Sequence, residues 1–417
     1  MAYATRPVRP TFTLSDVFGP EPVFNPRASF RRYGWLPPEA SVLDSFTGGF
    51  LPAAGATPTI CFAGVATGAG LDLLAEAGLP QADTLLTYTS QAEYYQRLAD
   101  AIASGRPIVV QHVHRLPEIP ASSYWVARDL LAYLNNKGNL ADLVPAEALP
   151  PRRLVDVEEL RTQADRPLVV KAVSDRTSGG GGAVIVARSP DDLRQAARKF
   201  AGCRRVVVEE FLDFQENFCL NFVVTLDGRI HYLGAGEQVV TASGEYQGNW
   251  FERDRRPPDE AIELSREIVR RAVERGYRGF AGFDAGVLPD GRVKVFDLNF
   301  RTNGSTKALL FGQGVQEAFG APPAARLVGL HGTGTFSEMC RAAREALRRG
   351  IFVPLGTCDP TVFPGRAGSP AVSGLVLGES RGDVLANLQH LADHGLASSV
   401  SAAPASLAEP SLLRRAA

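Results

Sequence analysis

Two aspartates, at positions 284 and 297, are the strongest candidates for chemistry in this chain. They lie in the stretch from Phe280 to Arg301, where two apolar-rich runs flank the dipeptide Asp290-Gly291, which suits a two-residue hairpin turn. A turn centred there places Asp284 directly across from Asp297, with Cβ atoms about 5 Å apart, and facing like charges destabilise a strand pair. Two such carboxylates form an oxygen-ligand site for Mg²⁺. The alternative is a solvated hairpin face with ordinary charges.

Alternation along the second strand of this hairpin divides its side chains between two faces. Side chains 296, 298 and 300 form an apolar face, whereas the polar face carries Asp297, Asn299 and Arg301. Asn299 adds an amide oxygen to the two carboxylates, and Arg301 adds a cation beside them.

A glycine-rich loop lies between two predicted strands further upstream. The run LVVKAV carries Lys171, the loop holds Gly179 to Gly182, and the run AVIVA follows. Glycine lets the backbone approach a ligand and direct its N–H groups at phosphates. A P-loop would require GKS or GKT and a following helix, and neither is present. The sequence therefore predicts a glycine flap between antiparallel strands, and either phosphate binding or a plain flexible hairpin explains it.

A third candidate is an apolar strand that ends in acidic residues. The run RVVVEEFLDFQENF places Glu209 and Glu210 at the strand end, with Glu216 following in the next run. Backbone groups at such a strand end can pair with an adenine edge, and a carboxylate can hold ribose hydroxyl groups. Acidic residues at a strand end are more often solvated surface, so this element alone favours the surface interpretation.

The order of these elements resembles that of the ATP-grasp superfamily. A lysine strand with a glycine flap comes first, the Glu-Glu strand follows, and the DxNxR hairpin comes last, so that the resemblance covers roughly residues 130–314. The α/β segment before it looks like a pre-ATP-grasp domain. The resemblance implies an α/β plus α+β fold in which two α+β subdomains grip ATP, with metal ligands on the deeper one. A narrower likeness is to peptide ligases of the pheganomycin type in natural-product pathways.

The resemblance also implies roles for individual residues. Lys137, in NNKGNL, and Lys171 resemble the two phosphate-contacting lysines, and Arg301 and Lys171 are the expected catalytic cations. Glu209 resembles the residue that contacts the adenine amino group, and Glu216 the ribose carboxylate. The full set of expected nucleotide-binding residues is Lys137, Lys171, Ser178, Gly179, Gly180, Gly181, Glu209, Glu210, Phe211, Leu212 and Glu216. The expected metal ligands are Asp284, Asp297 and Asn299.

Asp297 stands where many enzymes of this type carry glutamate. Its shorter side chain reaches less far, which leaves open whether one or two metal ions bind. The implied cofactors are ATP and Mg²⁺, with Mn²⁺ as a substitute. The implied reaction joins a carboxylate to an amine through an acyl-phosphate and releases ADP. The alternatives are the loading of an amino acid onto a carrier-protein thiol and nucleotide binding without catalysis.

Hydrophobic patterning divides the chain into three portions. Residues 1–125 are expected to hold an extension that wraps on the surface and a small parallel α/β domain. Residues 126–320 are expected to form the ATP-grasp core, with a long helix within 122–138 leading into hairpins and one clear helix at about 259–275. The loop 242–258 is either an acceptor-substrate loop or plain surface. Residues 321–417 are expected to complete the grasp domain, with two helices and a disordered tail after 398.

Composition limits the classes of partner. The 417 residues carry a formal net charge of −1, with 45% hydrophobic and 21% charged residues, as in ordinary globular proteins. Neither nucleic acid nor a membrane is expected as a partner, and five scattered cysteines without CxxC spacing argue against disulfides and structural zinc. The first residues lack a signal-peptide core, so a cytoplasmic location is expected. The expected partners are small carboxylate and amine substrates, amino acids or peptides, with a carrier protein and a second copy of the chain left open.

Overall fold

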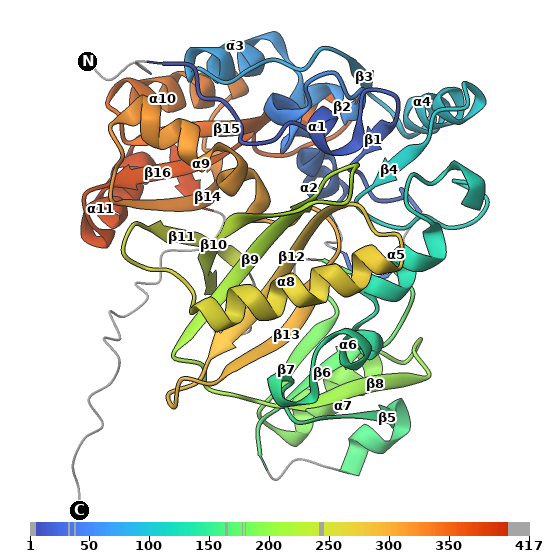
Figure 1. Ribbon diagram of the computed structural model, residues 1–417. Coiled ribbons are helices and arrows are strands. Elements are labelled where there is room, and N and C mark those ends of the chain that lie inside the picture. The colour runs from blue at the N-terminus through green and yellow to red at the C-terminus, as the bar shows by residue number, and fades with distance from the viewer. Residues whose placement is uncertain are drawn as a thin grey trace, which may run out of the picture.

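The computed structural model describes residues 6–31, 34–36, 39–162, 166–176, 178–179, 181–241 and 246–398. Gly180 of the expected flap and the expected tail after residue 398 lie outside the described residues. The described chain forms three sheets. In Figure 1 the small antiparallel sheet lies at the bottom, and the large sheet runs from it toward the N-terminal part at the top.

A parallel sheet of four strands forms the N-terminal part. Its order is β3-β2-β1-β4, and its strands are β1 (Val23–Asn25), β2 (Thr59–Phe62), β3 (Leu85–Tyr88) and β4 (Ile108–Val110). The accompanying helices are α1 (Leu14–Phe18), α2 (Ala40–Ser45), α3 (Gly68–Glu76) and α4 (Gln91–Ala103). The parallel α/β architecture is as predicted, except that β1 comes from the segment expected to wrap on the surface. Three residues are too few to show a strand period, yet Val23 and Phe24 are buried in the sheet.

The long helix expected over residues 122–138 is wrong. Only Arg128–Asn135 (α5) is α-helical there, and the short helix α6 (Leu140–Leu143) follows. The Trp125 N–H donates to the Ile108 carbonyl oxygen, so the chain before α5 runs along β4. The Asn136 side chain accepts the N–H of Gly138, and this local turn ends the helix directly before Lys137.

A small antiparallel sheet has the order β5-β8-β6-β7. Its strands are β5 (Arg152–Asp156), β6 (Leu168–Ala172), β7 (Val184–Ala187) and β8 (Arg205–Glu210). Helix α7 (Pro190–Lys199) packs on one face of this sheet through a shared apolar cluster. Sequence reasoning missed α7, although Ser189 and Asp192 form a capping box at its start, which is a readable helix signal.

The largest sheet has nine strands among the described residues, in the order β13-β12-β9-β10-β11-β14-β16-β15, with β17 beside β14. They are β9 (Glu216–Val224), β10 (Ile230–Val240), β11 (Tyr246–Glu252), β12 (Gly279–Val287), β13 (Val293–Asn299), β14 (Ala324–Gly332), β15 (Phe352–Cys358), β16 (Ala371–Gly378) and β17 (Leu396–Ser398). The helices of this part are α8 (Asp259–Glu274), α9 (Thr306–Phe319), α10 (Phe336–Arg348) and α11 (Arg381–Asp393). Figure 1 shows α8 crossing one face of β9 and β12.

One expectation for this region is wrong, because residues 246–252 of the expected loop form strand β11. Helix α9, which begins inside the part expected to be dominated by strands, was not predicted. Strands from before and after residue 320 belong to one continuous sheet. The division of the chain into domains at residues 125 and 320 remains a prediction.

The hairpin between β12 and β13 closes through a three-residue loop, not the expected two-residue turn. The Leu288 N–H donates to the Arg292 carbonyl oxygen and the Gly291 N–H to that of Leu288. Gly291 has a φ of +85°, as in a type I turn followed by a left-handed residue. The longer loop shifts the register by one residue. A bulge beside Asp284, in which Phe296 is the extra residue, shifts it back.

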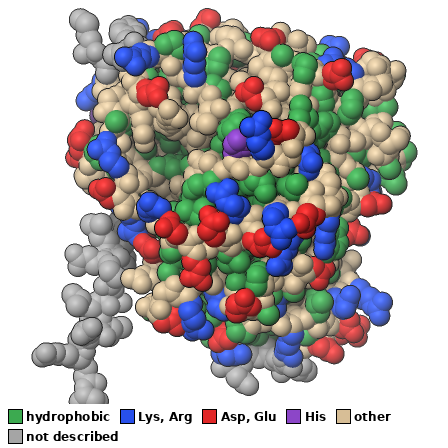
Figure 2. All heavy atoms as spheres, in the orientation of Figure 1, with side chains coloured by type: hydrophobic (Ala, Val, Ile, Leu, Met, Phe, Trp, Pro, Cys, Tyr) green, Lys and Arg blue, Asp and Glu red, His purple; other side chains and the backbone are tan. Residues whose placement is uncertain are grey.

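The molecular surface mixes both charges. On the face in Figure 2, Lys and Arg side chains are interspersed with Asp and Glu side chains, and arginines of α8 pair with glutamates of the same helix, for example Arg270 with Glu267. Within the described part of the chain, we find no helix with both the length and the apolar character needed to cross a membrane.

Candidate active site

Asp284 and Asp297 face each other across β12 and β13, as the sequence predicted. Both side chains are only partly exposed, and the Gln238 amide donates to Asp284 Oδ1 at 2.8 Å. Burial, and then the charge of Asp297, raise the pKa of Asp284 to about 7. Burial acts in the same direction on Asp297, but nearby lysine and arginine cations outweigh it and hold the pKa of Asp297 below its usual value. The pair therefore concentrates negative charge that a bound cation would stabilise.

Cations from distant parts of the chain surround Asp297. Lys137, which lies 160 residues earlier, donates a hydrogen bond to Asp297 Oδ1. Arg301 follows on the same chain segment and donates to the Ser178 carbonyl oxygen of the flap at 3.0 Å. Burial lowers the pKa of Arg301, although the two aspartates oppose this effect. The Asn299 amide nitrogen lies 3.5 Å from Asp297 Oδ2, so Asp297, Lys137, Arg301, Asn299 and Ser178, five of the predicted site residues, come together here.

Lys171 of β6 connects the small sheet to the large one. Its Nζ donates to the Phe296 carbonyl oxygen at 2.6 Å and lies 2.5 Å from Glu209 Oε2. Phe296 is the bulged residue of β13, and a bulge leaves its extra residue outside the ladder pairing. The Phe296 ring stacks on that of Phe214, with centroids 5.3 Å apart. An apolar surface thus lies beside the predicted phosphate lysine and the predicted adenine glutamate.

The other predicted nucleotide contacts lie from the last residue of β8 to the first residue of β9. Glu210 pairs with Arg166 at 2.9 Å, and the guanidinium of Arg188 lies 4.7 Å from the Phe211 ring centroid. Leu212 follows in the connection between the two strands. Glu216 pairs with Arg255 at 2.6 Å. Arg255 belongs to the segment whose role the sequence left open, and the structure brings it to Glu216.

The flap packs against an N-terminal segment. The Gly179 N–H donates to the Trp35 carbonyl oxygen at 3.1 Å, and Ser178 and Trp35 form a parallel bridge. A Cβ at Gly182 would lie 2.6 Å from the same carbonyl oxygen, so this close approach requires glycine. Sequence reasoning missed Trp35, because no local pattern links it to a loop more than a hundred residues later.

The donor set of the acidic pair fits Mg²⁺. Mg²⁺ prefers oxygen ligands and is usually held by one or two carboxylates, with water and substrate phosphates completing its shell. Asp284 and Asp297 supply two carboxylates, and the side-chain amide of Asn299 supplies an oxygen. Within the residues that the structure describes, no three His, Cys, Asp or Glu side chains come together as a metal cluster. The oxygen-only, two-carboxylate character therefore favours Mg²⁺ shared with a phosphate ligand.

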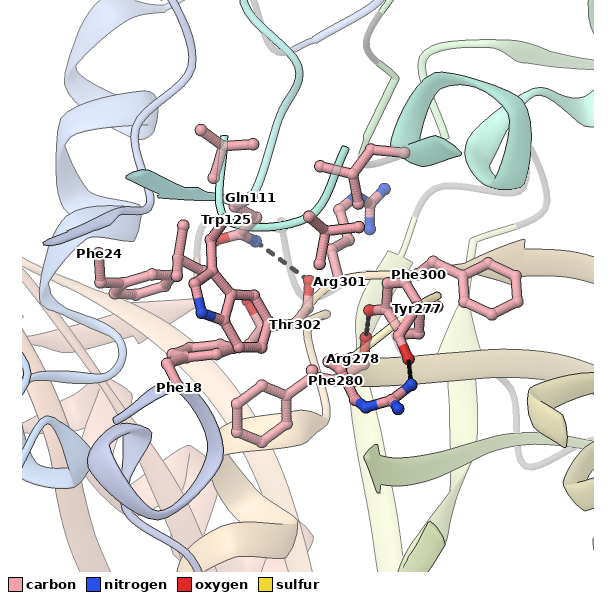
Figure 3. Close-up of a pocket in the computed structure, with 15 residues that line it drawn as sticks. Phe18, Phe24, Gln111, Trp125, Tyr277, Arg278, Phe280, Phe300, Arg301 and Thr302 are labelled. Carbon is pink, nitrogen blue, oxygen red and sulfur yellow. Dashed lines mark hydrogen bonds between the residues drawn. The ribbon is translucent and has the colours of Figure 1, made fainter. Parts of the chain in front are cut away.

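Two adjoining hollows lie between the N-terminal sheet and the hairpin. One is lined by polar residues that include Lys137, Asn299 and Arg301, and the other is mainly apolar, with Phe18, Trp125 and Phe280 among its lining residues (Figure 3). Gln111 and Arg301 line both, and the Gln111 amide donates to the Thr302 carbonyl oxygen at 3.2 Å, drawn as a dashed line in Figure 3. Each encloses about 30 Å³, which is room for roughly two water molecules.

A small antiparallel sheet that carries Lys171, a turn before it that carries Lys137, and a large sheet that carries the paired acids form the ATP-grasp arrangement, and the chain belongs to this superfamily. The model of the ATP-grasp domain of L-aspartate–L-methionine ligase matches residues 150–299. The model of the N-terminal domain of the same ligase matches residues 13–132. Together these matches span more than half of the chain, which therefore belongs to the L-aspartate–L-methionine ligase family.

Relatives and solved structures agree with this fold. A formate-dependent phosphoribosylglycinamide formyltransferase of Pseudomonas aeruginosa is 31% identical over 191 residues, which are 42% of this chain and 47% of that protein. The match thus spans about half the length of the curated relatives. An ADP complex of N5-carboxyaminoimidazole ribonucleotide synthetase aligns with a TM-score of 0.55 and 13% identity, covering 95% of this chain and 100% of its own. An L-amino acid ligase from Bacillus licheniformis aligns with a TM-score of 0.51 and 12% identity, covering 90% and 98%. The predicted α/β plus α+β ATP-grasp fold is confirmed.

Proposed function

We propose that the protein is an ATP-dependent ligase that joins a carboxylate to an amine and releases ADP and phosphate. The observation that carries the proposal is the facing pair Asp284 and Asp297, surrounded by Lys137, Lys171 and Arg301. Facing acids are unfavourable unless a cation joins them, and clustered cations suit a triphosphate. Membership of a ligase family supports the same reaction.

In this proposal the nucleotide lies between the small and the large sheet. Lys137 and Lys171 neutralise phosphate charge, and Glu209 and the residues after it receive the adenine. Asp284, Asp297 and Asn299 would hold Mg²⁺, which would supply charge stabilisation to the phosphates. Mn²⁺ has similar ligand preferences and is proposed as a substitute.

The reaction proceeds in two displacements. An oxygen of the substrate carboxylate bonds to the γ-phosphorus while the bond to the ADP oxygen breaks, which yields an acyl-phosphate and ADP. The amine nitrogen then bonds to the acyl carbon, and phosphate leaves with the bonding electrons. Arg301 stabilises the charge on the transferred phosphoryl group. The flap, which Arg301 contacts through the Ser178 carbonyl oxygen, keeps out water that would hydrolyse the acyl-phosphate.

We propose amino acids as substrates, L-aspartate and L-methionine, because the matching family models describe a ligase of these two amino acids. A carrier-protein thiol is the alternative acceptor. We place the reaction in the cytoplasm, where ATP and Mg²⁺ are available, in the synthesis of small peptides or natural products.

The test is a reconstitution with ATP, Mg²⁺ and pairs of amino acids, in which each component is omitted in turn. We expect ADP and phosphate to form only with both amino acids present, together with a condensed mass equal to their sum less one water. AMP and pyrophosphate as products would reject the acyl-phosphate route. Tight ATP binding without turnover on any amino-acid pair would instead support a non-catalytic nucleotide-binding protein.

A further inference from the structure

Arg152 is a buried cation that the sequence reasoning did not single out. It is the first residue of β5 and lies directly opposite Glu209 of β8 in the ladder between these strands. Its side chain is only 10% exposed. The next residue, Arg153, points to the other side of the strand and is exposed.

The contacts of Arg152 join both predicted phosphate lysines. Its Nη2 donates to the Lys137 carbonyl oxygen at 2.6 Å. Its Nη1 lies 3.6 Å from Glu209 Oε1, and the other oxygen of Glu209 lies 2.5 Å from Lys171 Nζ. The guanidinium therefore holds the backbone at Lys137 by a hydrogen bond and lies at ion-pair distance from Glu209, whose other oxygen pairs with Lys171.

The position is costly for an arginine. Burial lowers the pKa of Arg152, against the opposing charge of Glu209, and a buried ion pair often contributes no net stability compared with apolar residues of similar size. Stability alone thus does not explain an arginine at this position. An orienting function explains it better, because a planar guanidinium can hold two partners in fixed directions.

Glu209 has one oxygen available for a ligand. Its Oε1 is buried and accepts no hydrogen bond from the described residues, and the distance to Arg152 Nη1 is too long for one. The edge of adenine presents an amino donor where guanine presents a carbonyl acceptor. A carboxylate oxygen held in one direction accepts from the former and repels the latter.

We propose that Arg152 is a positioning residue for the nucleotide, which holds Glu209 oriented for the amino group of adenine and Lys137 in place for the phosphates. The inference rests on the proposed nucleotide binding. It adds that selectivity for ATP over GTP depends on Arg152 acting through Glu209.

The experiment measures the dissociation constants of ATP and GTP by calorimetry with the full chain and Mg²⁺. The variants are Arg152→Met, Arg152→Lys and the matched control Arg153→Met, which removes the same charge one residue away. We expect Arg152→Met to weaken ATP binding by roughly 10- to 100-fold, the scale of a lost hydrogen bond to a charged group, and to reduce the ATP-to-GTP preference. Arg152→Lys keeps a charge near Glu209 but lacks the two-partner geometry, so its selectivity should fall in between. Arg153→Met should bind both nucleotides like the parent.

Coupling to Glu209 separates positioning from general stability. If Arg152 acts through Glu209, the double variant Arg152→Met/Glu209→Gln should show the same ATP-to-GTP ratio as Glu209→Gln alone. Thermal unfolding identifies any misfolded variant. If Arg152→Met does not fold, the nucleotide selectivity of Arg152→Lys is the result that tests the inference. Unchanged nucleotide selectivity in folded Arg152 variants would overturn the inference while the proposed function stands. Absence of ATP binding by the parent protein would instead remove the proposed function itself.

Discussion

Replacement of Asp284 by asparagine should stabilise the protein without ligands while it destroys activity. The folded-state pKa of Asp284 is raised to about 7 by burial and by Asp297, against about 3.9 in an unfolded chain. Between these values the folded state binds more protons than the unfolded state, so stability falls as pH rises from about 4 to about 7. Above pH 7, the ionised Asp284 carboxylate lowers the free energy of unfolding by at most about 4 kcal/mol. Partial exposure of the side chain to solvent makes the actual loss smaller.

The variant removes this penalty and keeps the oxygen that accepts from Gln238. Chemical denaturation should therefore show Asp284→Asn to be more stable by up to about 4 kcal/mol at pH 8 but by only about 1.5 kcal/mol at pH 5. Asp290→Asn is the matched control, because Asp290 is exposed in the turn of the same hairpin and its hydrogen bonds with Arg292 lower its pKa. It should show no such gain.

The same variant tests the metal assignment. Mg²⁺ with an ATP analogue should stabilise the parent protein, by about 2.7 kcal/mol at a hundredfold excess over the dissociation constant, and should stabilise Asp284→Asn much less. ADP formation by the variant should be lost. Equal stability of parent and variant at pH 8, or an equal gain at pH 5 and pH 8, would refute the electrostatic reasoning about the facing acids.

Three further predictions concern the acids, the flap and a buried lysine. Asp297→Ala should lower ADP formation at least about 10²- to 10³-fold with an unchanged circular dichroism spectrum; normal turnover would reject its role as a metal ligand. Gly182→Ala should lower the free energy of unfolding by about 1–3 kcal/mol in denaturant titrations, because the added Cβ would meet the Trp35 carbonyl oxygen. The control Gly68→Ala, whose Cβ would meet no atom within 4 Å, should cost nothing, and equal effects of the two variants would refute the contact. Burial lowers the pKa of Lys307 to about 8, so the folded state disfavours the charged form of this lysine. Lys307→Met should therefore stabilise the protein at pH 7, and this gain in stability should decline between pH 8 and 10.5. A gain that is constant with pH would contradict this reasoning.

The sequence determined the elements whose signals are local. Strand Leu168–Ala172 with its lysine, the glycine loop after it, the helix 259–274 with Gly276 beyond its end and the DxNxR strand were all readable, because turn residues, caps and β-branched runs act over a few neighbours. Short or atypical elements escaped. Strand β1 has three residues, and the expected helix 122–138 is interrupted by hydrogen bonds to β4 and by the turn at Asn136.

The pairing of Asp284 with Asp297 shows how a local prediction can succeed for an incomplete reason. A two-residue turn gives this register, and so does a three-residue loop combined with one bulge. Turn chemistry alone could not reveal the bulge. The bulge also takes Phe296 out of the ladder pairing, and the Phe296 carbonyl oxygen accepts a hydrogen bond from Lys171. The bulge therefore creates a contact between the two sheets.

What the sequence by itself determined is the chemistry of the candidate site: which acids, lysines and glycines exist, and in what order. Apart from the facing of Asp284 and Asp297 within one hairpin, only the tertiary structure decided which of them meet. Lys137 reaches Asp297 across 160 residues, the backbone of Trp35 pairs with Ser178 of the flap, and Arg152 lies between Lys137 and Glu209. The physical reason is that such contacts follow from how separate apolar faces pack together, and that packing leaves no periodic or compositional trace near the residues it brings into contact.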